Sequence, residues 1–96
     1  MASYKLTQKA DEDLVDIFNY GIDHFGVDSA LAFYHELSSM FDRIANSPNQ
    51  FQAVGEIRQF YRRAVFKTYS IYFIEKHDFV EISRVVRKDD VRLIFS

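Results

Sequence analysis

Apolar residues in the first half of the chain recur at the spacing of an α-helix. Between Thr7 and Gly26 they lie three or four positions apart, starting with Ala10, Leu14 and Ile17, as on the buried face of an amphipathic helix. Thr7 is a residue type that caps helix N-termini, and glycine commonly ends helices. The pattern therefore predicts a helix between Thr7 and Gly26.

A second helix is predicted soon after Gly26. Asp28 or Ser29 can cap its N-terminus, and apolar residues at helical spacing continue over residues 30–44. We expect it to stop before the polar segment 46–48, which ends in the only proline. Because so few residues separate the two helices, we expect an antiparallel helical hairpin whose apolar stripes are core.

Strands are predicted at both ends of the chain. Residues 4–6 form a short β-like stretch, and after Ile57 β-branched and aromatic residues replace the helix formers. Three strands are predicted there, at about 58–65, 69–76 and 79–87. The middle one holds four consecutive apolar residues and is expected to be central in the sheet, whereas neither face of the last is cleanly apolar, so its register stays open.

These elements combine into a predicted α+β fold of order β-α-α-β-β-β, with the helical hairpin packed on one face of an antiparallel sheet. The chain has 96 residues, 48% hydrophobic and 27% charged, values typical of one soluble domain over residues 1–96. Cysteine is absent, which excludes disulfides and thiolate chemistry. Without a membrane-length apolar run or the apolar centre of a secretory signal, we expect a cytoplasmic protein.

Charge is divided unevenly along the chain. Residues 1–50 carry three Lys/Arg and eight Asp/Glu, a net charge of −5, whereas residues 51–96 carry nine and six, a net charge of +3. The acidic half is interpreted as a solvated helical face. The basic half suits an anionic partner.

Most catalytic motifs are missing. Gly21 and Gly26 have P-loop spacing, but the Lys and hydroxyl residue that hold phosphate do not follow. His24, His35 and His77 lack the spacing of a metal site and are interpreted as surface residues. An acidic cluster in the first helix has a structural reason to lie at a positive helix end; it consists of Asp11, Glu12, Asp13 and Asp16. We expect no cofactor and no metal.

A set of basic residues remains, interleaved with tyrosines on the predicted sheet. Arginine next to aromatic rings suits phosphates and exposed bases, and equally the carboxylates of an acidic protein; ordinary solvation of a sheet surface is the alternative. The apolar chain end, 93–95, either covers the core edge or anchors a second protein. The set comprises Arg58, Arg62, Arg63, Arg84, Arg87 and Lys88, with Tyr61, Tyr69 and Tyr72.

Over nearly the whole chain, the order and spacing of short motifs resemble those of ParE toxins from the RelE/ParE toxin–antitoxin superfamily. The β-α-α-β-β-β fold of that family agrees with the pattern. The motifs are Tyr4-Lys5-Leu6-Thr7, Ala10-Asp11-Glu12-Asp13-Leu14, Ile17-Phe18-Asn19-Tyr20, Phe25-Gly26, Ser47-Pro48-Asn49, Ile57-Arg58, Tyr72-Phe73 and Val80-Glu81-Ile82-Ser83-Arg84-Val85.

The resemblance implies a bacterial toxin that a ParD-like antitoxin holds inactive. ParE members trap the cleaved-DNA complex of DNA gyrase, which stops replication and arrests growth, a property linked to plasmid maintenance. They need no catalysis, since preferential binding to the cleaved state shifts the equilibrium. RelE members instead cut messenger RNA on the ribosome, and a shared fold does not choose between the two. A RelE-like endoribonuclease and an inactive interaction domain are therefore the alternatives.

Individual residues favour ParE. Arg87 matches a catalytic arginine of RelE enzymes, but Ser70 stands near the place of a second and Leu93 near a stacking tyrosine. His77, a possible acid or base, is expected at a solvent-facing turn. One departure from many ParE sequences is Phe73-Ile74 where they have Tyr-Arg, which weakens the case for a polar contact there.

The resemblance also implies two contact surfaces. The antitoxin is expected to lay an extended and helical segment between the hairpin and the sheet, and the free toxin to form a homodimer through the surface left exposed. Residues predicted to contact gyrase are Arg84, Arg87, Lys88, Leu93, Ile94 and Phe95. Residues predicted to contact the antitoxin are Arg58, Arg62, Arg63, Phe18 and Leu37.

Overall fold

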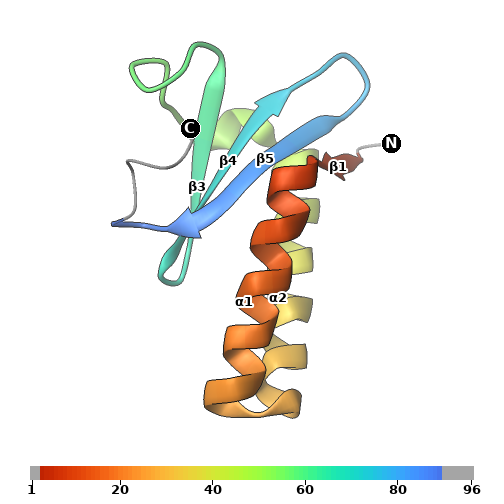
Figure 1. Ribbon diagram of the computed structural model, residues 1–96. Helices are drawn as coiled ribbons and strands as arrows, with labels where there is room; N and C mark the ends of the chain where they lie inside the picture. Colours follow the sequence, from red (N-terminus) through yellow and green to blue (C-terminus); the bar gives the residue numbers. More distant parts are fainter. Residues whose placement is uncertain (1–2, 90–96) are drawn as a thin grey trace.

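Two layers make up the part of the protein that the computed structural model describes, residues 3–89 (Figure 1). Two helices lie on one face of a five-stranded sheet, so the predicted α+β fold is confirmed. The elements are β1 (Tyr4–Leu6), α1 (Gln8–Phe25), α2 (Val27–Asn46), the 3-10 turn η1 (Pro48–Gln50), β2 (Gln52–Ala53), β3 (Tyr61–Phe66), β4 (Tyr69–Glu75) and β5 (Val80–Arg87).

The strand order is β1-β5-β4-β3-β2, which places β4 at the centre as predicted. β1 runs parallel to β5 while the other pairs are antiparallel. The sheet is therefore mixed, and the prediction of a wholly antiparallel sheet was wrong for β1. Alternation within a three-residue strand carries no information on the direction of its partner, and the long helical connection permits a parallel pair. The two-residue strand β2 had no sequence signal.

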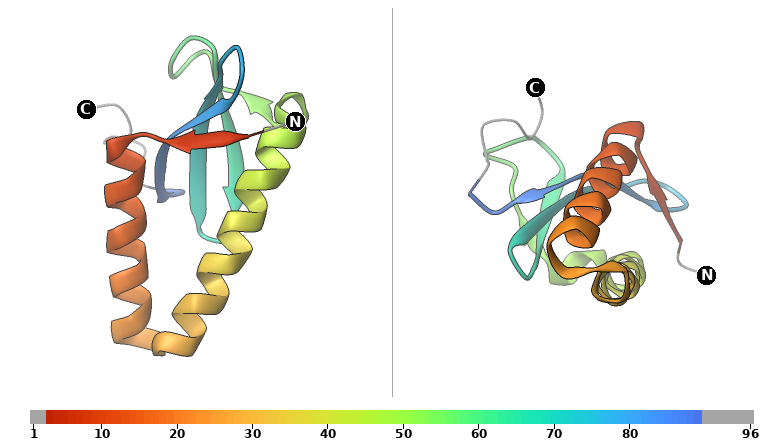
Figure 2. Two further views of the ribbon diagram at one scale, coloured as in Figure 1. Left: turned by 90° about the vertical axis from the view of Figure 1, so that its right-hand side faces the viewer. Right: turned by 60° about the horizontal axis from the view of Figure 1, so that its bottom comes forward.

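Thr7 caps α1 as predicted: its hydroxyl accepts a hydrogen bond from the Ala10 amide at 3.1 Å. Gly26 alone separates the helices, with φ 91° and ψ 165°. The expected side-chain cap of α2 was wrong, because Asp28 and Ser29 already lie in its first turn. From Gly26 the helices diverge towards the sheet, and the hairpin extends well beyond the strands (Figure 2).

A β-bulge explains why the last strand lacked a clean alternation. Tyr72 pairs with Arg84 but its neighbour Phe73 pairs with Ile82, so Ser83 is an extra residue in β5. The core face accordingly receives Val80 and Ile82 before the bulge, and the phase of the buried residues changes after it.

The main core lies between the helices and the sheet. It includes Leu37, Phe41 and Ile44 from α2 and Ile71 and Phe73 from β4. A second, smaller cluster forms on the other face of the sheet around Val54, Tyr72 and Val86. No helix in residues 3–89 is long and apolar enough to cross a membrane.

Candidate functional site

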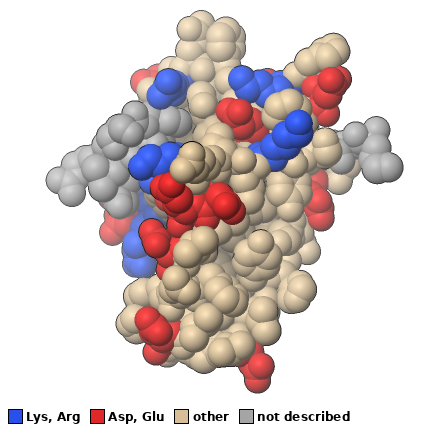
Figure 3. Space-filling view, turned by 45° about the vertical axis from the view of Figure 1, so that its right-hand side comes forward, with Lys and Arg blue, Asp and Glu red and all other residues tan. Residues whose placement is uncertain are grey.

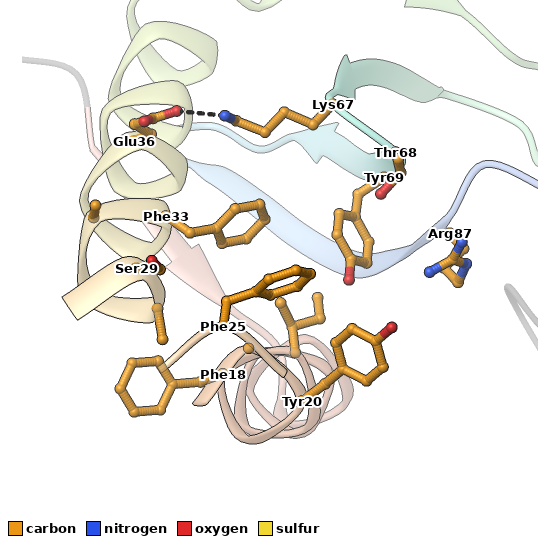
Figure 4. A pocket seen from close by; sticks show the side chains of 14 residues that line it. Phe18, Tyr20, Phe25, Ser29, Phe33, Glu36, Lys67, Thr68, Tyr69 and Arg87 are labelled. Atoms are coloured by element: carbon orange, nitrogen blue, oxygen red, sulfur yellow. Dashed lines mark ion pairs between the residues drawn. The ribbon is translucent and has the colours of Figure 1, made fainter. Parts of the chain in front are cut away.

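A cavity of about 530 Å³ opens between the helical hairpin and one end of the sheet, the end that holds the β3–β4 turn and the last residue of β5 (Figure 4). Both helices line it, together with the β3–β4 turn and the last residue of β5. The hairpin forms one wall because it continues past the strands, so its inner face is only partly covered there. The lining residues used below are Phe18, Phe25, Phe33, Glu36, Lys67, Tyr69 and Arg87.

Aromatic rings form the walls of the cavity. Phe33 packs edge-on against Tyr69 at 5.8 Å and Phe66 at 5.4 Å between ring centroids. Phe25 lies at the hairpin end and is 68% exposed. The two helices are in contact here, since a Cβ at Gly21 would lie 3.4 Å from the Cβ of Ala30. The cavity is thus an apolar recess suited to side chains of another molecule.

Charged residues occupy the rim. Lys67, in the β3–β4 turn with φ 54°, forms an ion pair with Glu36 of α2 at 2.9 Å. Arg87 stands at the end of β5, with Nε 3.9 Å from a carboxylate oxygen of Asp89 and a side chain 57% exposed. A carboxylate or phosphate next to the cavity can therefore reach Arg87.

Arg84, predicted as a gyrase contact, is bound within the structure. Its Nε and one terminal nitrogen donate to the two carboxylate oxygens of Asp13 at 2.9 and 3.1 Å. Both side chains are 14% exposed. Asp13 therefore ties α1 to β5, a role that its place in an acidic first turn did not reveal.

Side chains from the N-terminal part of α1 also form hydrogen bonds with backbone groups on the outer edge of β5. β1 pairs only as far as Ile82, and beyond it the Thr7 hydroxyl donates to the Ser83 carbonyl at 2.9 Å. Six residues after Thr7, the carboxylate of Asp13 accepts a hydrogen bond from the Val85 amide at 2.9 Å. Side chains of α1 thus continue the hydrogen bonding that β1 begins.

The basic residues predicted to contact the antitoxin have intramolecular contacts of their own. Arg62 donates to the Phe51 carbonyl at 2.7 Å, and Arg63 to the Ser70 hydroxyl at 2.9 Å. Arg58 lies over the Tyr61 ring at 5.9 Å. These contacts hold the loop before β3 and the open face of the sheet in place.

Other predicted contact residues differ in exposure. Lys88 is exposed after β5, and Phe18 lines the cavity. Leu37 is only 2% exposed, because it lies in the core between α2 and the sheet. It has almost no surface for a partner, so we leave it out of the antitoxin surface below. Leu93, Ile94 and Phe95 lie outside the described residues.

Ser70 and His77, the two other described positions compared with RelE enzymes, do not complete a cleavage site around Arg87. Ser70 is 1% exposed. His77 lies in the β4–β5 turn with its side chain 97% exposed, at the opposite end of β5 from Arg87. Within residues 3–89 no His, Cys, Asp and Glu cluster could hold a metal ion.

Sequence reasoning missed the cavity. The pattern assigns the apolar residues Phe25, Phe33 and Tyr69 to the core. Their spacing does not show that the hairpin extends beyond the sheet. The lengths give no clear signal either. At about 1.5 Å per helical residue and about 3.3 Å per strand residue, the 18- and 20-residue helices are little longer than the eight-residue strand β5.

Comparisons with known proteins agree on one family. The family profile described as "ParE toxin of type II toxin-antitoxin system, parDE" matches residues 4–92. "Toxin ParE1" of Caulobacter vibrioides is 30% identical over 73 residues, 76% of each chain. "Toxin ParE1" of Mycobacterium tuberculosis is 28% identical over 86 residues, 88% of each chain. A solved structure titled "Chromosomal ParDE TA system from P. aeruginosa" has the same fold, with TM-score 0.78, 24% identity and coverage of 91% and 96%.

Proposed function

This chain belongs to the family of ParE toxins of type II ParDE toxin–antitoxin systems, and we propose that it inhibits DNA gyrase by stabilising the cleaved-DNA complex. A ParD-like antitoxin neutralises it. The activity is binding without catalysis, and it takes place in the bacterial cytoplasm, where gyrase acts. The toxin halts replication because the bound complex cannot reseal its DNA.

The separation of Arg87 from His77, the possible acid or base, supports binding over RNA cleavage. Ribonuclease chemistry needs a cation and an acid or base around one phosphate. Here Arg87 stands at one end of β5, His77 is in the turn at the other end, and Ser70 is buried with its hydroxyl accepting from Arg63. Arg87 can bind an anion, but His77 is not beside it. Ser70 pairs with Val86, the neighbour of Arg87, yet it is buried and supplies no cation.

We place the gyrase contact at the end of β5. Arg87 and Lys88 are exposed there, next to an apolar cavity. Residues 93–95 are proposed to extend this contact. Arg84 supports it from inside, since its pairing with Asp13 fixes β5 against α1.

The antitoxin surface is proposed to run from the cavity to the loop before β3 and the first residues of β3. Phe18 contributes to the apolar end, and Arg58, Arg62 and Arg63 contribute cations at the other. A segment that alternates apolar and acidic side chains fits this combination. Because the surface includes the cavity beside Arg87, the bound antitoxin blocks access to the gyrase contact.

The test mixes the purified toxin with gyrase, supercoiled plasmid and ATP, and measures linear DNA after detergent and protease. We expect linear DNA with the wild type. Arg87→Ala should lower it by about tenfold, the effect of losing one charged hydrogen bond. Lys76→Ala, an exposed cation at the far end of β4, is the matched control and should behave as wild type.

If folded wild-type toxin yields no linear DNA, gyrase inhibition is contradicted, and ribosome-dependent cleavage of messenger RNA becomes the activity to test. Equal activity of Arg87→Ala and Lys76→Ala would instead contradict the position of the contact.

A further inference from the structure

The outer face of the helical hairpin, turned away from the sheet, carries apolar residues that nothing in the described chain covers. We use the term outer hairpin face for Val15 on α1 and Val27, Leu31 and Tyr34 on α2. Their exposed fractions are 54%, 54%, 45% and 42%. Helical spacing places Leu31 opposite Phe33, which faces the sheet, so the outer hairpin face and the cavity lie on different sides of the hairpin.

Contacts between α1 and α2 lie beneath the outer hairpin face. The Tyr34 ring packs edge-on against Phe18 at 6.1 Å between centroids, which joins the two helices. Ala30, beside the outer hairpin face on α2, is 4% exposed and lies against Gly21. The exposed side chains therefore stand on two helices that pack against each other.

The charges around this face have one sign. Between Lys9 and Arg43 the sequence contains no Lys or Arg. Asp11, Asp23 and Asp28 are exposed on the same two helices. Figure 3 shows the result: the lower part of the molecule, over the hairpin, is tan and red, and the blue atoms lie above it.

An acidic border around apolar residues favours one class of partner over others. DNA and RNA are disfavoured because their phosphates are repelled by the aspartates and meet no cation here. A second copy would bring the same aspartates together across a two-fold axis. A protein surface that carries Lys or Arg around an apolar depression matches both the charge and the apolar area.

We propose that the outer hairpin face docks onto a basic, partly apolar protein surface of the toxin's target. This rests on the function proposed above, in which the target is a complex of protein and DNA. The acidic hairpin then contacts protein, while the basic end of β5 stands on another part of the molecule and is suited to the anionic component. The two contacts are separate and can be removed one at a time.

The experiment compares wild type, Leu31→Ser, Asp23→Lys and Val65→Ser. Leu31→Ser removes apolar contact area, and Asp23→Lys reverses one charge of the border. Val65→Ser is the matched control, because Val65 is 51% exposed on β3, away from the hairpin. Thermal unfolding confirms that each variant folds. Growth arrest is titrated against toxin expression, and plasmid linearisation by gyrase is measured in parallel.

We expect Leu31→Ser to need at least about tenfold more toxin for growth arrest, the loss typical of a contact near the centre of an interface. Asp23→Lys should need more toxin than wild type because its new charge repels the basic partner. The Val65→Ser control should match wild type. Folded hairpin variants that are as toxic as the control would overturn the proposal. So would a change from dimer to monomer in Leu31→Ser by sedimentation, which would make this face a contact between copies.

The two readouts separate this proposal from the function on which it rests. A wild type that arrests growth without linearising DNA contradicts gyrase as the target, and the growth titration of the variants still decides on the outer hairpin face. A wild type without either effect overturns both proposals.

Discussion

Asp13 joins α1 to the last strand of the sheet through its carboxylate. It accepts two hydrogen bonds from Arg84 and a third from the Val85 amide, and with 14% exposure it is well shielded from water. Charged hydrogen bonds in such a position contribute more than surface ion pairs, whose contribution is about 0–1 kcal/mol.

Asp13→Asn should therefore lower the free energy of unfolding by about 2–3 kcal/mol, because the Arg84 charge keeps its position but loses its counter-ion. Urea unfolding measures the change. Asp16→Asn, three residues along the same helix and exposed, should stay within about 0.5 kcal/mol of wild type. Equal stability of the two variants would show that the pair contributes no more than a surface charge.

Tyr4 makes the folding stability of the protein depend on pH in the alkaline range. Burial raises the pKa of its hydroxyl above the ordinary value of 10.0, with smaller contributions from Asp42 and Tyr34. A group whose folded-state pKa is raised stabilises the fold fully below the unfolded-state pKa and loses this contribution as pH rises through the folded-state pKa.

Tyr4→Phe should consequently lose less stability than wild type between about pH 9 and about pH 11, a window set by the unfolded-state pKa of tyrosine. Chemical denaturation at both pH values measures this. Tyr20→Phe, at a 47% exposed position, serves as control and should follow wild type. Parallel curves for Tyr4→Phe and wild type would refute the assignment.

Among the elements, the helical hairpin depends on a single residue for its turn. Gly26 combines φ 91° with ψ 165°, a region that residues with a Cβ rarely adopt. No heavy atom lies within 4 Å of a Cβ added there, so the cost of a substitution comes from the backbone alone.

Gly26→Ala should destabilise the protein by about 1–3 kcal/mol for this reason, as measured by thermal or urea unfolding. Gly55→Ala is the control, since a Cβ there also meets nothing and φ is not positive; we expect little change or a slight stabilisation. A neutral Gly26→Ala would mean that the turn can relax into another conformation.

The elements were predictable to different degrees. The helices and β4 followed from spacing and burial, because a long amphipathic stripe and a doubly buried run are strong local signals. The parallel pairing of β1, the bulge at Ser83 and the bond from Asp13 to Arg84 join residues distant in the chain. Spacing within one element does not report such pairs. The cavity beside Arg87 was not predicted for the same reason, because it depends on how far the hairpin extends beyond the sheet.

At the scale of the whole molecule, the uneven charge of the sequence becomes a division in space. The hairpin between Lys9 and Arg43 is acidic, and the basic residues gather on the sheet and its loops. An antitoxin that occupies the cavity and reaches the loop before β3 binds only the folded chain. By linkage it should stabilise the toxin by about 2.7 kcal/mol at a hundred times its Kd.

Denaturant unfolding of the toxin with and without a ParD-like antitoxin measures this gain. Arg58→Ala should reduce it, because it removes an exposed cation of the proposed antitoxin surface. Arg43→Ala, an exposed cation on α2, should leave it unchanged. A gain that is the same in both variants would place the antitoxin elsewhere.

The attachment of β1 and Thr7 to β5 has a consequence for synthesis. Thr7 and Ser83 are 76 positions apart in sequence, and β1 has no other strand neighbour. The sheet therefore closes only after β5 has left the ribosome, since a pairing cannot form before its later partner is available. A nascent chain that lacks β5 carries the hairpin but no complete sheet, so the toxin folds only after β5 has been made.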